Sequence, residues 1–248
     1  MDNEQFEMLK SKISHNLAEI REIAERAARV SGRTSDEIAI LAISKRQSVE
    51  VIDAAYQSGL RKFGESYVQE ALPKIEHFHQ QTDIRWDMVG HLQSRKARPV
   101  AENFHAVHSL DSLKLAELLN KYRPSDKSPL EVFLEVNIGD ESSKTGFPTK
   151  NETDLAALVI VVNQISKMES LNLVGLMAMP PLFANPELSR PYFHKLRNLR
   201  DYLNAQSKGV KLNQLSAGTS VDFAVAIEEG ATIVRIGERL LGPRNYTN

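Results

Sequence analysis

The chain has 248 residues, of which 42% are hydrophobic and 25% are charged. This composition is typical of a soluble globular protein, and the length suffices for a sizeable core. Lysine and arginine number 31 against 32 acidic residues, so the net charge of −1 gives no reason to expect nucleic acid or an anionic membrane as a partner. The absence of cysteine excludes disulfides, thiolate nucleophiles and thiolate zinc sites.

The N-terminal segment predicts a helix over residues 3–31. Apolar side chains three and four residues apart make one stripe along it: Phe6, Leu9, Ile13, Leu17, Ile20, Ile23 and Ala27. The segment lacks the apolar stretch of a secretory signal, and no run in the chain approaches the roughly 18 apolar residues of a membrane span. We therefore expect a cytoplasmic protein whose first helix packs on the rest of the domain.

Short apolar runs then alternate with helical patterns. Eight runs predict strands: 38–44, 62–64, 86–90, 106–110, 131–138, 173–179, 214–217 and 232–236. Ser48 opens a helix that stops at Gly59, and Asp111 is expected to cap another. The segment 93–103 has the least regular helical pattern, because Pro99 interrupts it unless it lies near a helix start.

Eight strand–helix alternations in this length predict a single (β/α)8 barrel of the TIM type over residues 1–248, with residues 3–31 as an extra helix. A doubly wound open sheet is the alternative. It usually has fewer strands, and here no glycine-rich phosphate turn follows the first strand. No linker or shift in composition marks a second domain.

The active site of such a barrel lies at the C-terminal ends of its strands. Lys45 directly follows the first strand, and Ser66 follows the second. Alternation along the last strand puts Arg235 on the same face as Ile233, so we expect its guanidinium to point into the upper barrel and to need an acceptor there. This cation is expected to lower the pKa of Lys45.

Loops that contain glycine follow the last two strands. The first holds Ser216 and Gly218, and the second begins with Gly237 and Glu238. Barrels commonly bind phosphate at this place, through exposed backbone N–H groups and small side chains.

A lysine, an inward arginine and a phosphate cradle together fit a phosphorylated aldehyde. A lysine amine bonds a carbonyl as a Schiff base. Pyridoxal 5'-phosphate (PLP) would place its aldehyde on Lys45, its phosphate on the loops and its pyridine nitrogen on Arg235. Arginine does not give up its proton, so the ring would stay unprotonated and be a weaker electron sink. An aldolase that forms a Schiff base with a sugar phosphate, without a cofactor, is a second interpretation.

Seven segments along the chain, in their joint order, carry a family resemblance. They are AISK (42–45), FGESYVQEALPKI (63–75), WDMVGHLQSRK (86–96), SSKTGF (142–147), GLMAM (175–179), LSAGTSVD (215–222) and VRIGERLLG (234–242). In this order the chain resembles the pyridoxal phosphate homeostasis proteins, which bind PLP on a single barrel related to the N-terminal domain of alanine racemase.

The resemblance implies a fold-type III PLP barrel without the β-domain of the racemases. It implies a Schiff base on Lys45, Arg235 at the pyridine nitrogen, and Ser216, Gly237 and Glu238 around the phosphate. The implied role is to bind this form of vitamin B6 and supply it to PLP-dependent apo-enzymes. Dedicated turnover is not expected beyond a weak side activity, and a monomer is favoured over an oligomer.

The chain departs from the family pattern in four places, one of which is the segment SAGTS (216–220) in place of Ser-Met-Gly-Met-Ser. Ser66 stands where asparagine is usual, Asp87 replaces a signature histidine, and Glu238 stands where a small hydroxyl residue is common. These departures concern the contacts to the cofactor rather than its identity.

A PLP-dependent amino-acid racemase is a third interpretation of the function. It needs a second acid/base group from a separate β-domain, which we do not expect in this chain. His91 is interpreted as a polar group at the barrel rim and Lys144 as a loop charge. The pairs His77/His79 and His105/His108 lack convincing acidic companions, so no metal site is predicted.

Overall fold

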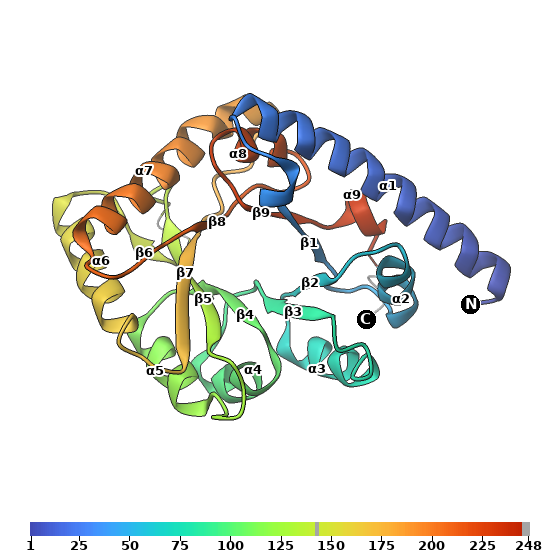
Figure 1. Ribbon diagram of the computed structural model, residues 1–248, viewed down its shortest axis with the longest axis horizontal. Coiled ribbons are helices and arrows are strands. Elements are labelled where there is room, and N and C mark those ends of the chain that lie inside the picture. The colour runs from blue at the N-terminus through green and yellow to red at the C-terminus, as the bar shows by residue number, and fades with distance from the viewer. Residues whose placement is uncertain (142–143, 245–248) are drawn as a thin grey trace.

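The computed structural model describes residues 1–141 and 144–244, so Ser142 and Ser143 of the SSKTGF segment lie outside the described residues. Eight parallel strands form a closed ring (Figure 1). They are β1 (Ala39–Ile43), β2 (Lys62–Glu65), β3 (Arg85–Met88), β4 (Ala106–Leu110), β5 (Leu130–Asn137), β7 (Leu171–Met177), β8 (Gln214–Ser216) and β9 (Ile233–Ile236). Because β9 pairs with β1, with Ala39 opposite Ile233, and β4 pairs with β5, the ring of eight strands is closed. The predicted (β/α)8 barrel is confirmed, and the open sheet was wrong.

Helices surround this ring (Figure 1). The α-helices are α1 (Asn3–Val30), α2 (Val49–Gln57), α3 (Val68–His77), α4 (Ala97–Asn103), α5 (Leu113–Tyr122), α6 (Glu152–Ile165), α7 (Arg190–Gln206), α8 (Phe223–Glu228) and α9 (Glu238–Leu241). Short 3-10 helices are η1 (Ser35–Glu37), η2 (Ser94–Lys96) and η3 (Pro186–Ser189). In the described part of the chain, no helix has the length and apolar character needed to cross a bilayer.

The extra helix α1 covers the barrel where its first and last strands meet. It lies against α2, α9 and α8, which follow one another along its inner side (Figure 1). Asp2 caps it by accepting from the Gln5 backbone N–H at 2.8 Å, and the apolar stripe buries Ile13, Leu17 and Ile20. Burying each of these side chains stabilises the fold by roughly 1.5–3 kcal/mol. The apolar stripe that predicts the helix is therefore also the face that packs against the barrel.

Three details differ from the expected elements. Ser112, not Asp111, caps α5 by accepting from the backbone N–H of Leu115, which leaves Asp111 free to face the rim of the barrel. Pro99 is tolerated because it is the third residue of α4, where its missing N–H has no intrahelical partner to lose. The short strand β6 (Phe147–Pro148), beside the end of β5, has no signal in the sequence.

One part of the barrel interior is a separate apolar cluster inside the ring. It is built from Leu41, Ile43, Ala106, Phe133, Met177 and Ile233, one set of alternate residues from the strands. The other alternate residues, such as Val234 and Ile236, pack outward in the main core against the helices. Since Ile233 faces inward, Arg235 does too, as the strand alternation predicts.

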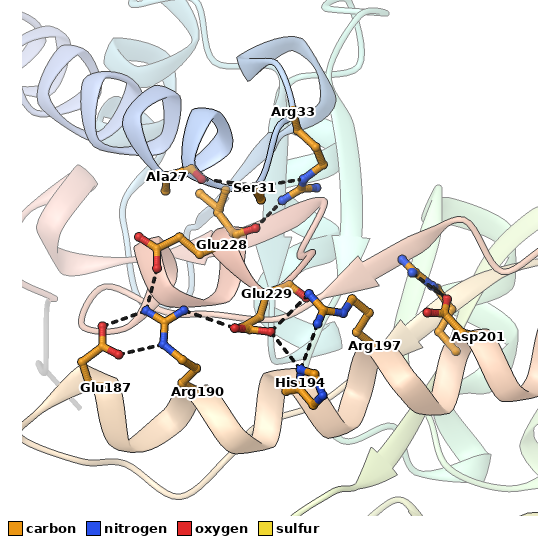
Figure 2. Close-up of polar contacts among 12 residues, drawn as sticks. Ala27, Ser31, Arg33, Glu187, Arg190, His194, Arg197, Asp201, Glu228 and Glu229 are labelled. Carbon is orange, nitrogen blue, oxygen red and sulfur yellow. Dashed lines mark hydrogen bonds and ion pairs between the residues drawn. The ribbon is translucent and has the colours of Figure 1, made fainter.

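An ion network joins α7 to the end of α8 (Figure 2). Arg190 at the start of α7 binds Glu187 at 2.7 Å, Glu228 at 2.6 Å and Glu229 at 3.2 Å, the last two at the C-terminal end of α8. Arg33, in the link from α1 to β1, donates to the carbonyl groups of residues 227 and 231 and so satisfies the end of α8. These contacts fix α8, and with it the loop between β8 and α8.

Candidate active site

A cleft of about 920 Å³ opens at the C-terminal ends of the barrel strands. Five of the residues predicted from the sequence line it together: Lys45, Ser66, Arg235, Gly237 and Glu238. They come from the ends of β1, β2 and β9, which lie side by side in the ring. The cleft therefore lies where active sites of this fold are found.

Lys45 lies in a tight turn directly after β1. The backbone N–H of Gln47 donates to the carbonyl of Ser44 at 3.0 Å, and Arg46 has the left-handed φ of 59°. For a residue other than glycine this conformation costs of order 1–3 kcal/mol, and such strain persists only where the surroundings enforce it. The turn presents Lys45 to the cleft, and its strain needs an external support.

A buried cluster on α3 supplies that support. The ammonium of Lys74 donates to the Ser44 carbonyl at 2.9 Å, to Glu65 Oε1 at 2.8 Å and to Glu70 Oε1 at 2.5 Å. Glu70 also accepts from the backbone N–H of Arg46. Lys74 and Glu65 are 6% and 0% exposed, so this ion pair is shielded from solvent. The residues on both sides of Lys45 are thus bonded to one buried group of charges.

The pKa of Lys45 is lowered. Burial of the amine is the main cause, followed by the positive charges of Arg244 and Arg46, while Glu65 and Glu70 partly oppose the shift. The predicted direction is right, but Arg235, which we expected to cause it, is not among the principal causes. Arg235 instead turns toward the floor of the cleft. A lowered pKa raises the fraction of unprotonated amine near neutral pH, and this is the form that attacks a carbonyl.

Arg235 is buried and well satisfied on one side. Both N–H bonds of its NH1 group are used, by the Ser216 carbonyl at 2.7 Å and the Ser216 hydroxyl at 2.8 Å, and NH2 donates to the Ala178 carbonyl at 3.0 Å. Burial lowers its pKa to about 10. A guanidinium has five N–H bonds, so Nε–H and one NH2 hydrogen have no acceptor among the described residues. Since Arg235 lines the cleft, these donors are available to a ligand.

Ser216 and Gly218 occupy different places from the other predicted residues. Ser216 is fully buried below the cleft, where its hydroxyl contacts both Arg235 and His108. Gly218 has φ of 89°, and a Cβ there would lie 2.9 Å from Cα of Phe223, so this glycine lets α8 pack closely on the barrel. Neither belongs to the cleft wall. Their predicted contact with a phosphate stays a prediction.

The corner of the cleft beside β9 gathers groups suited to an anion. Gly237 and Ser220 line it together with Arg244. A Cβ on Gly237 would lie 3.2 Å from the guanidinium of Arg244, so glycine keeps this turn open. Glu238 pairs with Arg244 at 3.5 Å and is half exposed, which draws its carboxylate toward a cation.

Two charged residues of the cleft were missed by the sequence reasoning: Glu135 and Arg244. Glu135 lines the cleft from β5, and burial raises its pKa. Its Oε1 accepts from Thr145 at 2.8 Å, while its buried Oε2 has no partner among the described residues. Strand alternation from the inward Phe133 could have found it. Ser220 lies in the same loop after β8 as the predicted Gly218, and no pattern marks Arg244.

The remaining candidates have structural roles. His91 contacts Asp111 at 3.1 Å at the rim, as interpreted. Lys144 binds Glu141 at 2.5 Å and the Met179 carbonyl at 2.9 Å within its loop. Ser66 does not cap α3, because Tyr67 holds that position. No group of three His, Asp or Glu side chains that could hold a metal ion occurs within residues 1–141 and 144–244.

Comparison with known proteins gives consistent matches along the chain. The family model of the alanine racemase N-terminal domain matches residues 10–245. The pyridoxal phosphate homeostasis protein of Vibrio alginolyticus is 39% identical over 242 residues, which cover 96% of this chain and 99% of that protein.

Solved structures agree. PipY of Synechococcus elongatus PCC7942, solved without PLP, is 33% identical with a TM-score of 0.77, covering 89% of this chain and 100% of that one. The same protein with PLP bound gives 32% identity and a TM-score of 0.75, with the same coverage. The chain therefore belongs to the alanine racemase N-terminal domain family, in the group of the pyridoxal phosphate homeostasis proteins.

Proposed function

We propose that this protein binds pyridoxal 5'-phosphate in the cleft, covalently through Lys45. The observation that carries the proposal is the joint placement of the Lys45 amine, with its lowered pKa, and the unused donors of Arg235 on one cleft. The size of the cleft and its donors fit the group. The related PipY has been solved with PLP bound, which supports the same ligand here.

Each residue has a distinct task in this proposal. Lys45 would supply the amine that holds the aldehyde, and the buried cluster around Lys74 holds the turn that presents this amine. Arg235 would offer a hydrogen-bond donor to the ring nitrogen, and as a permanent cation it would not accept a proton from the ring. Ser220, the Gly237 backbone and Arg244 would hold the phosphate, and contact of Ser216 and Gly218 with it stays a prediction. When bound, the group would supply an aldehyde held reversibly and a ring of modest electron-withdrawing power.

The protein is proposed to store PLP and deliver it to apo-enzymes. Related proteins of this group carry the name of homeostasis proteins, which supports a role in supply over a dedicated reaction. A reversible bond to a lysine at an open cleft suits this role, since the cofactor must leave again.

Titration of the apo protein with PLP tests the proposal. We expect saturable binding with a new absorption band that is lost in Lys45→Ala and retained in Lys96→Ala, a second lysine of the cleft wall. Transfer is tested by mixing the loaded protein with a PLP-dependent apo-enzyme and following recovery of its activity. Absence of any band at saturating PLP would contradict binding and favour the cofactor-free aldolase. Rapid racemisation of alanine would contradict the supply role.

A further inference from the structure

A column of buried polar groups runs through the barrel interior beneath Arg235. From the cleft downward, Arg235 NH1 contacts Ser216 Oγ at 2.8 Å, Ser216 Oγ contacts His108 Nδ1 at 2.8 Å, and His108 Nε2 contacts Asp87 Oδ2 at 3.2 Å. Asp87 then meets Arg85 at 3.0 Å. Ser216, His108 and Asp87 are 0%, 0% and 1% exposed, which is unusual for polar groups in a barrel core.

The chemistry of the end groups sets the direction of every hydrogen in this column. A carboxylate only accepts, so His108 Nε2 must carry a hydrogen to bond Asp87. Nδ1 of the neutral ring is then an acceptor, and it takes the single hydrogen of the Ser216 hydroxyl. The Ser216 oxygen can therefore only accept from Arg235, which is the bond observed. The reverse order would place the lone pair of an unprotonated Nε2 against the Asp87 carboxylate, which has no hydrogen to donate.

The surroundings of the column favour this state. Arg85, which also binds Glu131 at 2.5 Å, and the hydrogen bond from His108 hold the Asp87 carboxylate ionised. The His108 ring stacks on Phe133 with a centroid distance of 4.2 Å, so it faces no second acid there. Burial lowers the pKa of His108, which keeps the ring neutral. The positive charge of Arg235 acts in the same direction.

We propose that Asp87 and His108 are positioning residues for Arg235. They fix the direction of the Ser216 hydroxyl, and this hydroxyl holds the guanidinium so that its unused N–H groups face the cleft. Only the consequence for the cofactor rests on the proposed function; the hydrogen-bond order is a property of the protein alone.

The decisive measurement is made on the apo protein. Long-range 1H–15N NMR distinguishes the two ring nitrogens of a histidine. We expect His108 to be neutral with its hydrogen on Nε2. A hydrogen on Nδ1, or on both nitrogens, would overturn the proposal, and no variant needs to fold for this test.

The variant Asp87→Asn keeps the shape and allows the ring to reverse, because an amide can donate to Nε2. We expect the Arg235 Nε–H signal to shift in this variant and PLP affinity to fall about tenfold, the size of one hydrogen bond to a charged group. Thr232→Val is the control, since it removes a hydroxyl that bonds the Leu215 backbone N–H at 3.0 Å away from the cleft. An unchanged Arg235 signal in Asp87→Asn would overturn the proposal. Failure of the wild-type protein to bind PLP would instead refute the proposed function.

Discussion

The buried cluster behind the Lys45 turn makes a quantitative prediction. Lys74→Met removes the ammonium but keeps the length of the side chain, and it leaves Glu65 without its main partner. Removing one member of a buried ion pair typically costs about 3–5 kcal/mol, because the remaining charge stays desolvated. We expect a loss of this size in the free energy of unfolding, measured by urea denaturation of the apo protein at pH 7.

The expected loss of stability comes from the burial of the ion pair and not from the short distance between its charges. The chain offers a control that separates these two causes. Lys10 and Glu7 on α1 lie 2.8 Å apart, the same distance as Lys74 and Glu65, but their side chains are 31% and 54% exposed against 7% and 0%. Exposed pairs contribute roughly 0–1 kcal/mol. Lys10→Met should therefore cost less than about 1 kcal/mol in the same assay.

The double variant Lys74→Met/Glu65→Gln tests the reason for the loss. Removing the stranded carboxylate should restore much of the stability lost in Lys74→Met. Burial already raises the pKa of Glu65 with Lys74 present, and losing the cation raises it further. The deficit of Lys74→Met should thus shrink as the pH falls and Glu65 gains a proton. Two results would refute the reasoning. One is a loss of stability in Lys74→Met as small as that in Lys10→Met. The other is a double variant whose loss equals the sum of the losses in Lys74→Met and Glu65→Gln.

Three further predictions concern the cleft. The rate at which PLP reacts with the apo protein should rise with pH, with a midpoint below that of free lysine because the pKa of Lys45 is lowered. Arg244→Gln removes one of the positive charges that lower this pKa, so it should move the midpoint up. Stopped-flow absorbance measures both rates, and a midpoint at the free-lysine value would contradict the shift. Glu135→Gln should stabilise the apo protein at pH 7, since the raised pKa of Glu135 means that its ionisation opposes folding. In urea denaturation the gain in unfolding free energy should fade toward pH 4, where Glu135 is protonated. No gain at pH 7 would show the carboxylate to be solvated. Gly90→Ala should weaken PLP binding in a fluorescence titration, because its Cβ would lie 2.3 Å from the Ser66 carbonyl and force two walls of the cleft apart; unchanged affinity would mean that these walls do not shape the site.

The sequence predicts the barrel well because its strongest signals are local. Buried parallel strands are short apolar runs, and a helix that covers them carries a stripe such as that of α1. The chain direction also tells which end of a barrel strand is the C-terminal one, where the cleft opens. Lys45 and Arg235 could therefore be placed at the cleft from the sequence. Asp111 was assigned wrongly as a cap because Ser112 next to it is an equally good one.

Other features of the site depend on contacts between distant segments. In the sequence Lys74 is an ordinary polar residue of a helix. Only the packing of the folded chain shows that its ammonium donates to the carbonyl of Ser44, 30 residues earlier. Ser216 sits at a strand end where a ligand contact was reasonable, yet the side chain is directed below the cleft. His108 carried no signal beyond its spacing from His105, since its partners come from β3 and β8.

The covalent attachment of PLP to Lys45 can be measured directly. The protein is loaded with PLP, reduced with borohydride and digested, and the peptides are mapped by mass spectrometry. The added mass of the reduced cofactor is expected on the peptide that contains Lys45, and Lys96 and Lys144 should remain unmodified. A label on another lysine, or none at saturating PLP, would contradict the central role of Lys45.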